Sequence, residues 1–203
     1  MEEFLNLFKS GPALLLLSCS ILIGLFSPAI LFRSKFKKST KRNNEKYPRF
    51  LTIYSLLGKK IFFLIMLLES ITTFFLMFTA IYFLHSILIS ALVAIIIMAA
   101  HSFSILHPLR GGSGTGPIIG ILLACSPWTL IICLTFFLLI YIFTKQIEHA
   151  EILTIAIMPS FSIIVSDGDL IFILMTTILS MISIKKRWYL IKEIFDHKKK
   201  SLS

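Results

Sequence analysis

Long runs without formal charge are the feature that most constrains how this chain can fold. Five stretches of the 203-residue sequence are apolar almost throughout: residues 12–32, 61–84, 87–100, 118–143 and 170–184. A helix needs about 20 such residues to cross a bilayer. Hydrophobic residues make up 57% of the chain and charged residues 15%, which is more apolar than a typical soluble domain. We therefore expect an all-helical (all-α) polytopic membrane protein.

Helix breakers divide these runs into about seven transmembrane helices. The run from residue 61 to 103 is too long for one crossing and is expected to break near Leu84-His85-Ser86. Ser126-Pro127-Trp128 interrupts the next run, because proline ends a helix and tryptophan favours the membrane interface. Ser166-Asp167-Gly168-Asp169 is a turn signal. The expected spans of a single membrane domain, residues 1–203, are approximately 12–32, 61–83, 87–105, 117–126, 128–144, 151–165 and 170–185.

The distribution of charge predicts the orientation. With seven spans, one side of the membrane receives the basic loop 33–60, Arg110, Lys145 and the basic tail 185–203. Loops rich in Lys and Arg stay cytoplasmic, so we expect the N-terminus outside and the C-terminus inside. The net charge is +10. We attribute it to topology and to contact with anionic lipid heads rather than to nucleic-acid binding.

A glycine-rich loop, RGGSGTG at residues 110–116, lies between the third and fourth expected spans. An Arg fork suits phosphate, and consecutive glycines let backbone N–H groups converge on an anion. Pro117 then suits the first turn of a helix whose positive dipole end faces the loop. These residues predict an oxyanion or phosphate site, although a plain turn between two helices remains an equal alternative. The cysteines lie in spans, and no metal-binding motif is present in the sequence.

The stretch from His101 to Trp128 resembles the second motif of the PlsY-type acyl-phosphate:glycerol-3-phosphate acyltransferases, roughly GHxFPxFxxFKGGKGVAT. His101, Phe103, Gly111, Gly112 and Gly114 match that motif, and Arg110 replaces a basic residue in kind. Further similarities are a Gly-Lys-Lys entry to the second span at residues 58–60, Glu69 in the place of an intramembrane Asp, and Thr144-Lys145 in the place of a Thr-Arg pair. The chain is thus similar to a family of small seven-helix enzymes.

The resemblance implies an enzyme of the bacterial inner (plasma) membrane that takes part in phospholipid biosynthesis. It would transfer an acyl group from acyl phosphate to glycerol 3-phosphate, give lysophosphatidate, and need no metal or cofactor. His101 would be the catalytic residue that holds or polarises the acceptor. Arg110, Gly111, Gly112, Ser113, Gly114 and Lys145 would bind phosphate. Glu69, being inside a span, needs a partner such as Ser90 or His101, and it is either a site residue or a structural hydrogen-bonding group.

Several positions depart from the family pattern. The first motif, near SGNxGATN, has no counterpart before residue 57, and Ser113 stands where the loop normally carries Lys. Glu148 and Glu151 replace serines and are expected to repel phosphate, and the C-terminal His and Asn are absent around Lys186 and Tyr189. Two alternatives to an active enzyme therefore remain. One is a catalytically inactive relative that acts as a partner or regulator. The other is a small transporter, suggested by the ionisable groups in or beside the spans.

Overall fold

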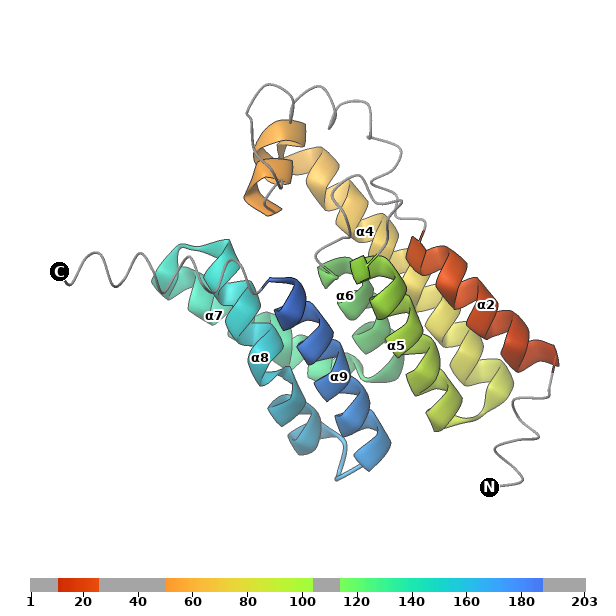
Figure 1. The fold of residues 1–203 in the computed structure, drawn as a ribbon. Helices are drawn as coiled ribbons and strands as arrows, with labels where there is room; N and C mark the ends of the chain where they lie inside the picture. Colours follow the sequence, from red (N-terminus) through yellow and green to blue (C-terminus); the bar gives the residue numbers. More distant parts are fainter. Residues whose placement is uncertain (1–10, 26–49, 104–113, 188–203) are drawn as a thin grey trace.

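The computed structural model describes residues 11–25, 50–103 and 114–187, with the backbone alone given for 50–57, 59 and 186. Within those residues the chain forms seven helices and no strand (Figure 1). The helices are α2 (Gly11–Leu25), α4 (Phe50–Leu84), α5 (Ile87–Phe103), α6 (Thr115–Cys125), α7 (Pro127–Thr144), α8 (Ile147–Val165) and α9 (Leu170–Lys186). The prediction of an all-helical protein of seven helices is confirmed. Most of the basic loop 33–60 and of the basic tail lies outside the described residues.

Apolar length divides these helices into two groups. Three segments are long and apolar enough to cross a bilayer by length and composition, Lys60–Leu84, Pro127–Thr144 and Ile147–Val165. The other apolar helices have between 10 and 17 residues. Short helices suit a membrane protein where one end meets a protein-lined polar region instead of lipid.

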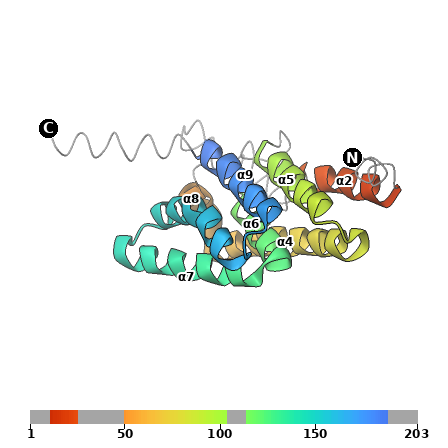
Figure 2. The same cartoon turned by 90° about the horizontal axis from the view of Figure 1, so that it is seen from below.

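The helix α6 lies at the centre of the described bundle. It packs most extensively on α4, while α5 packs on α2 and α9, and α8 packs on α7 and α9. Seen from below, α4 and α7 form one layer and α2, α5 and α9 form the other, with α6 between them (Figure 2). Six of the eleven residues of α6 are accordingly buried. The start of α6 is therefore held from several sides, which is what a binding site needs.

Local capping chemistry sets where the helices begin. The Ser86 hydroxyl accepts a hydrogen bond from the Ile89 amide at 3.4 Å, one turn into α5. Ser126 caps α7 ahead of Pro127 and accepts from the Thr129 amide at 3.4 Å. The Asp169 carboxylate accepts from the first amides of α9, at 3.0 Å from Ile171 N. Such caps satisfy amides that a helix start leaves without partners. The helices therefore begin at the helix-breaking segments that the sequence predicted.

Many large apolar side chains lie on the outside of the described bundle, and several hydroxyl-bearing side chains lie inside it beside the apolar core. Trp128, Phe143 and Ile164 are at least 70% exposed. Several buried hydroxyls donate to a carbonyl of their own helix, as Ser20 does to the Leu16 carbonyl at 2.6 Å and Ser162 to the Met158 carbonyl at 3.1 Å. This arrangement suits a lipid environment, where the exterior needs no polar groups and small residues let helices approach closely. The protein is an integral membrane protein.

Glycines of α6 allow its close contact with α4. A Cβ atom on Gly120 would lie 2.9 Å from Phe74 N and from Thr73 Cβ, and nearer still to the Ser70 carbonyl. The Ser70 hydroxyl also donates to the Gly116 carbonyl at 3.0 Å. Because backbone faces backbone here, no larger side chain fits without moving one helix. This contact fixes the position of the first turn of α6.

Candidate active site

The start of α6 is built for close approach by another group. Gly114, the N-cap, has φ 81°, a left-handed conformation that favours glycine. A Cβ there would collide with Met98 of α5 and would lie 3.7 Å from the Ser102 hydroxyl. That hydroxyl is buried and has no hydrogen-bond partner among the described residues. The first amides of α6, with the positive end of the helix dipole, therefore lie close to α5.

Two ionisable side chains meet beside Gly116. Glu69 of α4 and His101 of α5 are both buried, and Glu69 Oε2 lies 3.7 Å from His101 Nε2. A Cβ on Gly116 would lie only 2.8 Å from Glu69 Oε2, so the glycine makes room for the carboxylate. Of the two partners expected for Glu69, the structure places His101 next to it. The carboxylate can orient the imidazole and balance its charge if it takes up a proton.

A second polar cluster lies around Thr115, the residue of α6 directly before Gly116. Arg187, which follows α9, donates through Nη2 to Glu151 Oε1 of α8 at 2.6 Å and to Thr115 Oγ1 at 3.0 Å. The Thr115 hydroxyl donates to the same Glu151 oxygen. Glu151 and Arg187 are 5% and 4% exposed, so both charges are removed from solvent. The structure pairs the charge of Glu151 with that of Arg187, and repulsion of phosphate by Glu151 stays a prediction.

The residues predicted from the sequence are only partly brought together. His101, Gly114 and Glu69 lie around the first turn of α6, as described above. Arg110, Gly111, Gly112 and Ser113 lie outside the described residues. Lys145 is the C-cap of α7, where its backbone has φ 56° and its side chain is exposed. Their roles in binding phosphate stay predictions.

Sequence reasoning missed the buried position of Arg187, because that residue stands in a run of tail cations. A signal was present in α9, where the polar residues Thr176, Ser180 and Ser183 precede Arg187 at spacings of 4, 3 and 4. Such spacing puts them on one helical face. All four are buried in the structure. The polar face of α9 therefore predicts that Arg187 turns inward.

An apolar groove runs from this polar cluster along α6. It has a volume of about 440 Å³ and is walled by α4, α6, α7 and α8. Its lining is mostly apolar, including Phe62, Ile118 and Leu130, and the polar exceptions are Thr115, Tyr141, Glu151 and Thr154. A groove with this composition suits a hydrocarbon chain whose polar end reaches the start of α6.

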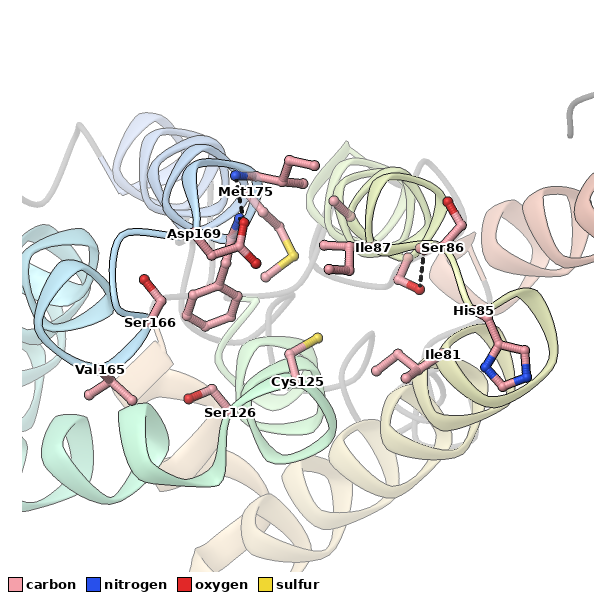
Figure 3. Close-up of a pocket in the computed structure, with 14 residues that line it drawn as sticks. Ile81, His85, Ser86, Ile87, Cys125, Ser126, Val165, Ser166, Asp169 and Met175 are labelled. Carbon is pink, nitrogen blue, oxygen red and sulfur yellow. Dashed lines mark hydrogen bonds between the residues drawn. The ribbon is translucent and has the colours of Figure 1, made fainter. Parts of the chain in front are cut away.

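A second cavity, of about 470 Å³, lies at the other end of α6 (Figure 3). It is lined by Cys125 and Ser126 at the end of α6, by Ser86 and by Ser166 and Asp169 before α9. The Asp169 carboxylate already caps α9, and no Lys or Arg lines the cavity. Among the described residues, no cluster of three His, Cys, Asp or Glu side chains could hold a metal ion. The start of α6 is therefore the stronger candidate for an active site.

Comparisons with known proteins identify a family. The family model described as glycerol-3-phosphate acyltransferase matches residues 14–197. A curated relative of that name from Mycoplasma pneumoniae is 26% identical, with 87% of this chain and 81% of the relative covered. The relative from Clostridioides difficile is 29% identical but covers 41% of each chain, and that from Fusobacterium nucleatum is 28% identical with 60% and 62% covered. The chain thus spans less than two thirds of the length of two of these relatives.

Two solved structures share the fold. One is PlsY (YgiH), described as an integral membrane glycerol 3-phosphate acyltransferase, in its glycerol 3-phosphate form, with TM-score 0.80, 19% identity, and 92% and 94% of the two chains covered. Its lysphosphatidic acid form gives TM-score 0.77 and 17% identity, with 92% and 93% covered. The fold similarity extends over nearly the whole chain, so the start of α6 sits within a shared architecture.

Proposed function

The chain belongs to the glycerol-3-phosphate acyltransferase family, and from this premise we propose that it transfers an acyl group from acyl phosphate to glycerol 3-phosphate to give lysophosphatidate. One observation carries the proposal. A buried polar cluster at the start of α6 opens directly into an apolar groove, with Thr115 and Glu151 shared by both. An acyl phosphate has the same division into a long apolar chain and an anionic head. The head would sit at the helix start and the chain in the groove.

The reaction needs one new bond and one broken bond. A hydroxyl oxygen of glycerol 3-phosphate attacks the acyl carbonyl carbon, and the bond between that carbon and the phosphate oxygen breaks. Inorganic phosphate leaves with the electron pair of the broken bond. His101 is the residue to take up the hydroxyl proton, and Glu69 at 3.7 Å holds and balances the imidazole. The reaction as written needs no cofactor.

The phosphate groups would be held at the start of α6. The left-handed Gly114 and the helix dipole give an anion-binding geometry without side-chain charge. Arg110, Gly111, Gly112 and Ser113 precede it directly in the sequence and would complete the cradle. Lys145 would add a cation from α7. Preorganised donors stabilise charge that develops on the leaving phosphate and on the carbonyl oxygen.

The site would face the cytoplasm of a bacterial cell, at the inner membrane. Helix alternation places Lys60, Lys145 and Lys185 at the same end of the described bundle as Gly114, whereas Asp167 and Asp169 lie at the other end. Because basic ends of spans stay inside, we assign the Gly114 end to the cytoplasm. The basic residues at this end would also contact anionic lipid heads.

Complementation of a host depleted of its own glycerol-3-phosphate acyltransferase tests the function. We expect rescue by the wild type, loss of rescue with His101→Ala or Arg110→Ala, and normal rescue with His85→Ala. His85 is a matched control, because it is an exposed histidine at the other end of the bundle. A wild-type protein that is present in the membrane but neither rescues growth nor acylates glycerol 3-phosphate in vitro would refute the proposal. It would instead favour a catalytically inactive partner of lipid-synthesis enzymes.

A further inference from the structure

Arg187 has more hydrogen-bonding capacity than its neighbours use. Its Nη2 donates to Glu151 Oε1 and Thr115 Oγ1, whereas Nη1 is buried and has no hydrogen-bond partner among the described residues. A buried donor without a partner costs free energy. The family resemblance assigned no role to this residue. An arginine that is 4% exposed and only half paired, beside the start of a helix, indicates that a further acceptor completes the site.

The surroundings of the guanidinium identify the kind of acceptor. The guanidinium contacts Thr115, the first residue of α6, where helix amides also offer donors and positive potential. The charge of Glu151 is already balanced through Nη2. The donors left for a ligand are therefore Arg187 Nη1 and the first amides of α6. Such a set of donors suits a phosphoryl group, because its oxygens accept several hydrogen bonds at once.

We propose that Arg187 binds a phosphoryl oxygen of the substrate through Nη1, while Glu151 and Thr115 hold the guanidinium in place through Nη2. Arg187 is then a phosphate ligand of the site and Glu151 is a positioning residue. This inference rests on the proposed function for the identity of the phosphate-bearing substrate. The proposal also gives Glu151 a role, because its carboxylate would lie unfavourably close to a bound phosphoryl group if Arg187 did not pair with it.

Inorganic phosphate is the direct probe. The full chain, purified in detergent, is heated at increasing phosphate concentration and constant ionic strength, because a ligand of the folded state raises the unfolding midpoint. We compare the wild type with the Glu151→Gln/Arg187→Gln double variant, which removes both charges but leaves two side chains that can hydrogen-bond each other. Lys185→Gln is the matched control, since Lys185 is an exposed cation two residues away on α9.

We expect the phosphate concentration for half-maximal stabilisation to rise about tenfold or more in the double variant, the value of a lost charge-assisted hydrogen bond. It should not change in Lys185→Gln. Equal phosphate dependence in the wild type and the double variant overturns the inference, as does a wild type that phosphate does not stabilise. If the double variant does not fold, Arg187→Lys serves instead. It keeps the charge without the two-nitrogen fork, so it should bind phosphate several-fold more weakly, and unchanged binding refutes the role.

Steady-state kinetics separate the two phosphate sources. One series varies acyl phosphate at saturating glycerol 3-phosphate and the other does the reverse, and the substrate whose KM rises in Arg187→Lys is the one that Arg187 binds. If the substituted enzyme is active and its KM values and phosphate binding are unchanged, the proposed function stands and the role of Arg187 is refuted. If the protein binds phosphate through Arg187 but does not acylate glycerol 3-phosphate, the anion site stands and the proposed function is refuted.

Discussion

Replacing Gly120 by alanine is expected to destabilise the protein although alanine is the better helix former. The new Cβ would lie 2.9 Å from Phe74 N and from Thr73 Cβ, and closer still to the Ser70 carbonyl oxygen. Two of these three atoms belong to the α4 backbone, so no rotamer change relieves the contact. Overpacking of this kind costs about 1–3 kcal/mol, and backbone contacts place the cost near the upper end.

Helix propensity offsets part of that cost. Alanine is favoured over glycine in a helix by about 1 kcal/mol, which leaves a net loss of about 2 kcal/mol. A chain of this length loses about 2–4 °C of melting temperature per kcal/mol, so the unfolding midpoint should fall by roughly 4–8 °C. Gly11→Ala is the control, because a Cβ there meets nothing within 4 Å. That variant should melt at the wild-type temperature or slightly above it.

Thermal unfolding of the purified protein in one detergent measures both variants. Activity gives a second readout, since pushing α6 from α4 separates the first turn of α6 from Glu69 and should lower kcat. If the melting temperature of Gly120→Ala equals that of the wild type, α4 and α6 are not in backbone contact. The packing argument for the position of the site would then be wrong.

Three further substitutions separate stability from chemistry. Glu151→Ala leaves Arg187 buried without its counter-charge and should cost about 3–5 kcal/mol in the free energy of unfolding, measured by thermal or denaturant unfolding; a loss below about 1 kcal/mol would contradict the buried pair. Asp169→Ala removes the α9 cap and should cost about 0.5–2 kcal/mol while kcat stays at the wild-type value, because the cap lies at the other end of the bundle. Glu69→Gln keeps the shape of the side chain and should lower kcat about tenfold or more by releasing His101, with little change in melting temperature; an unchanged kcat would exclude a positioning role for the carboxylate.

The sequence by itself determined the class of fold and the places where helices end. Apolar runs of membrane length admit little besides helices, because lipid offers no partners for backbone groups. Ser86, Ser126 and Asp169 accept hydrogen bonds from amides that follow them closely in the chain, so their effect is local and readable from the residues around them. His101 and Gly114 were singled out by the resemblance of their stretch to a family motif.

Only the tertiary structure decided which polar residues meet. Glu69 had two candidate partners, and its position opposite His101 depends on how α4, α5 and α6 pack through Gly116. Arg187 and Glu151 lie 36 residues apart, and each read alone suggested a different role, a cation at the membrane surface and an acid that repels phosphate. The structure shows instead that Arg187 is buried and that its charge balances the charge of Glu151, because two opposite charges removed from water must pair. Pairing across helices depends on packing geometry, which no local sequence pattern encodes.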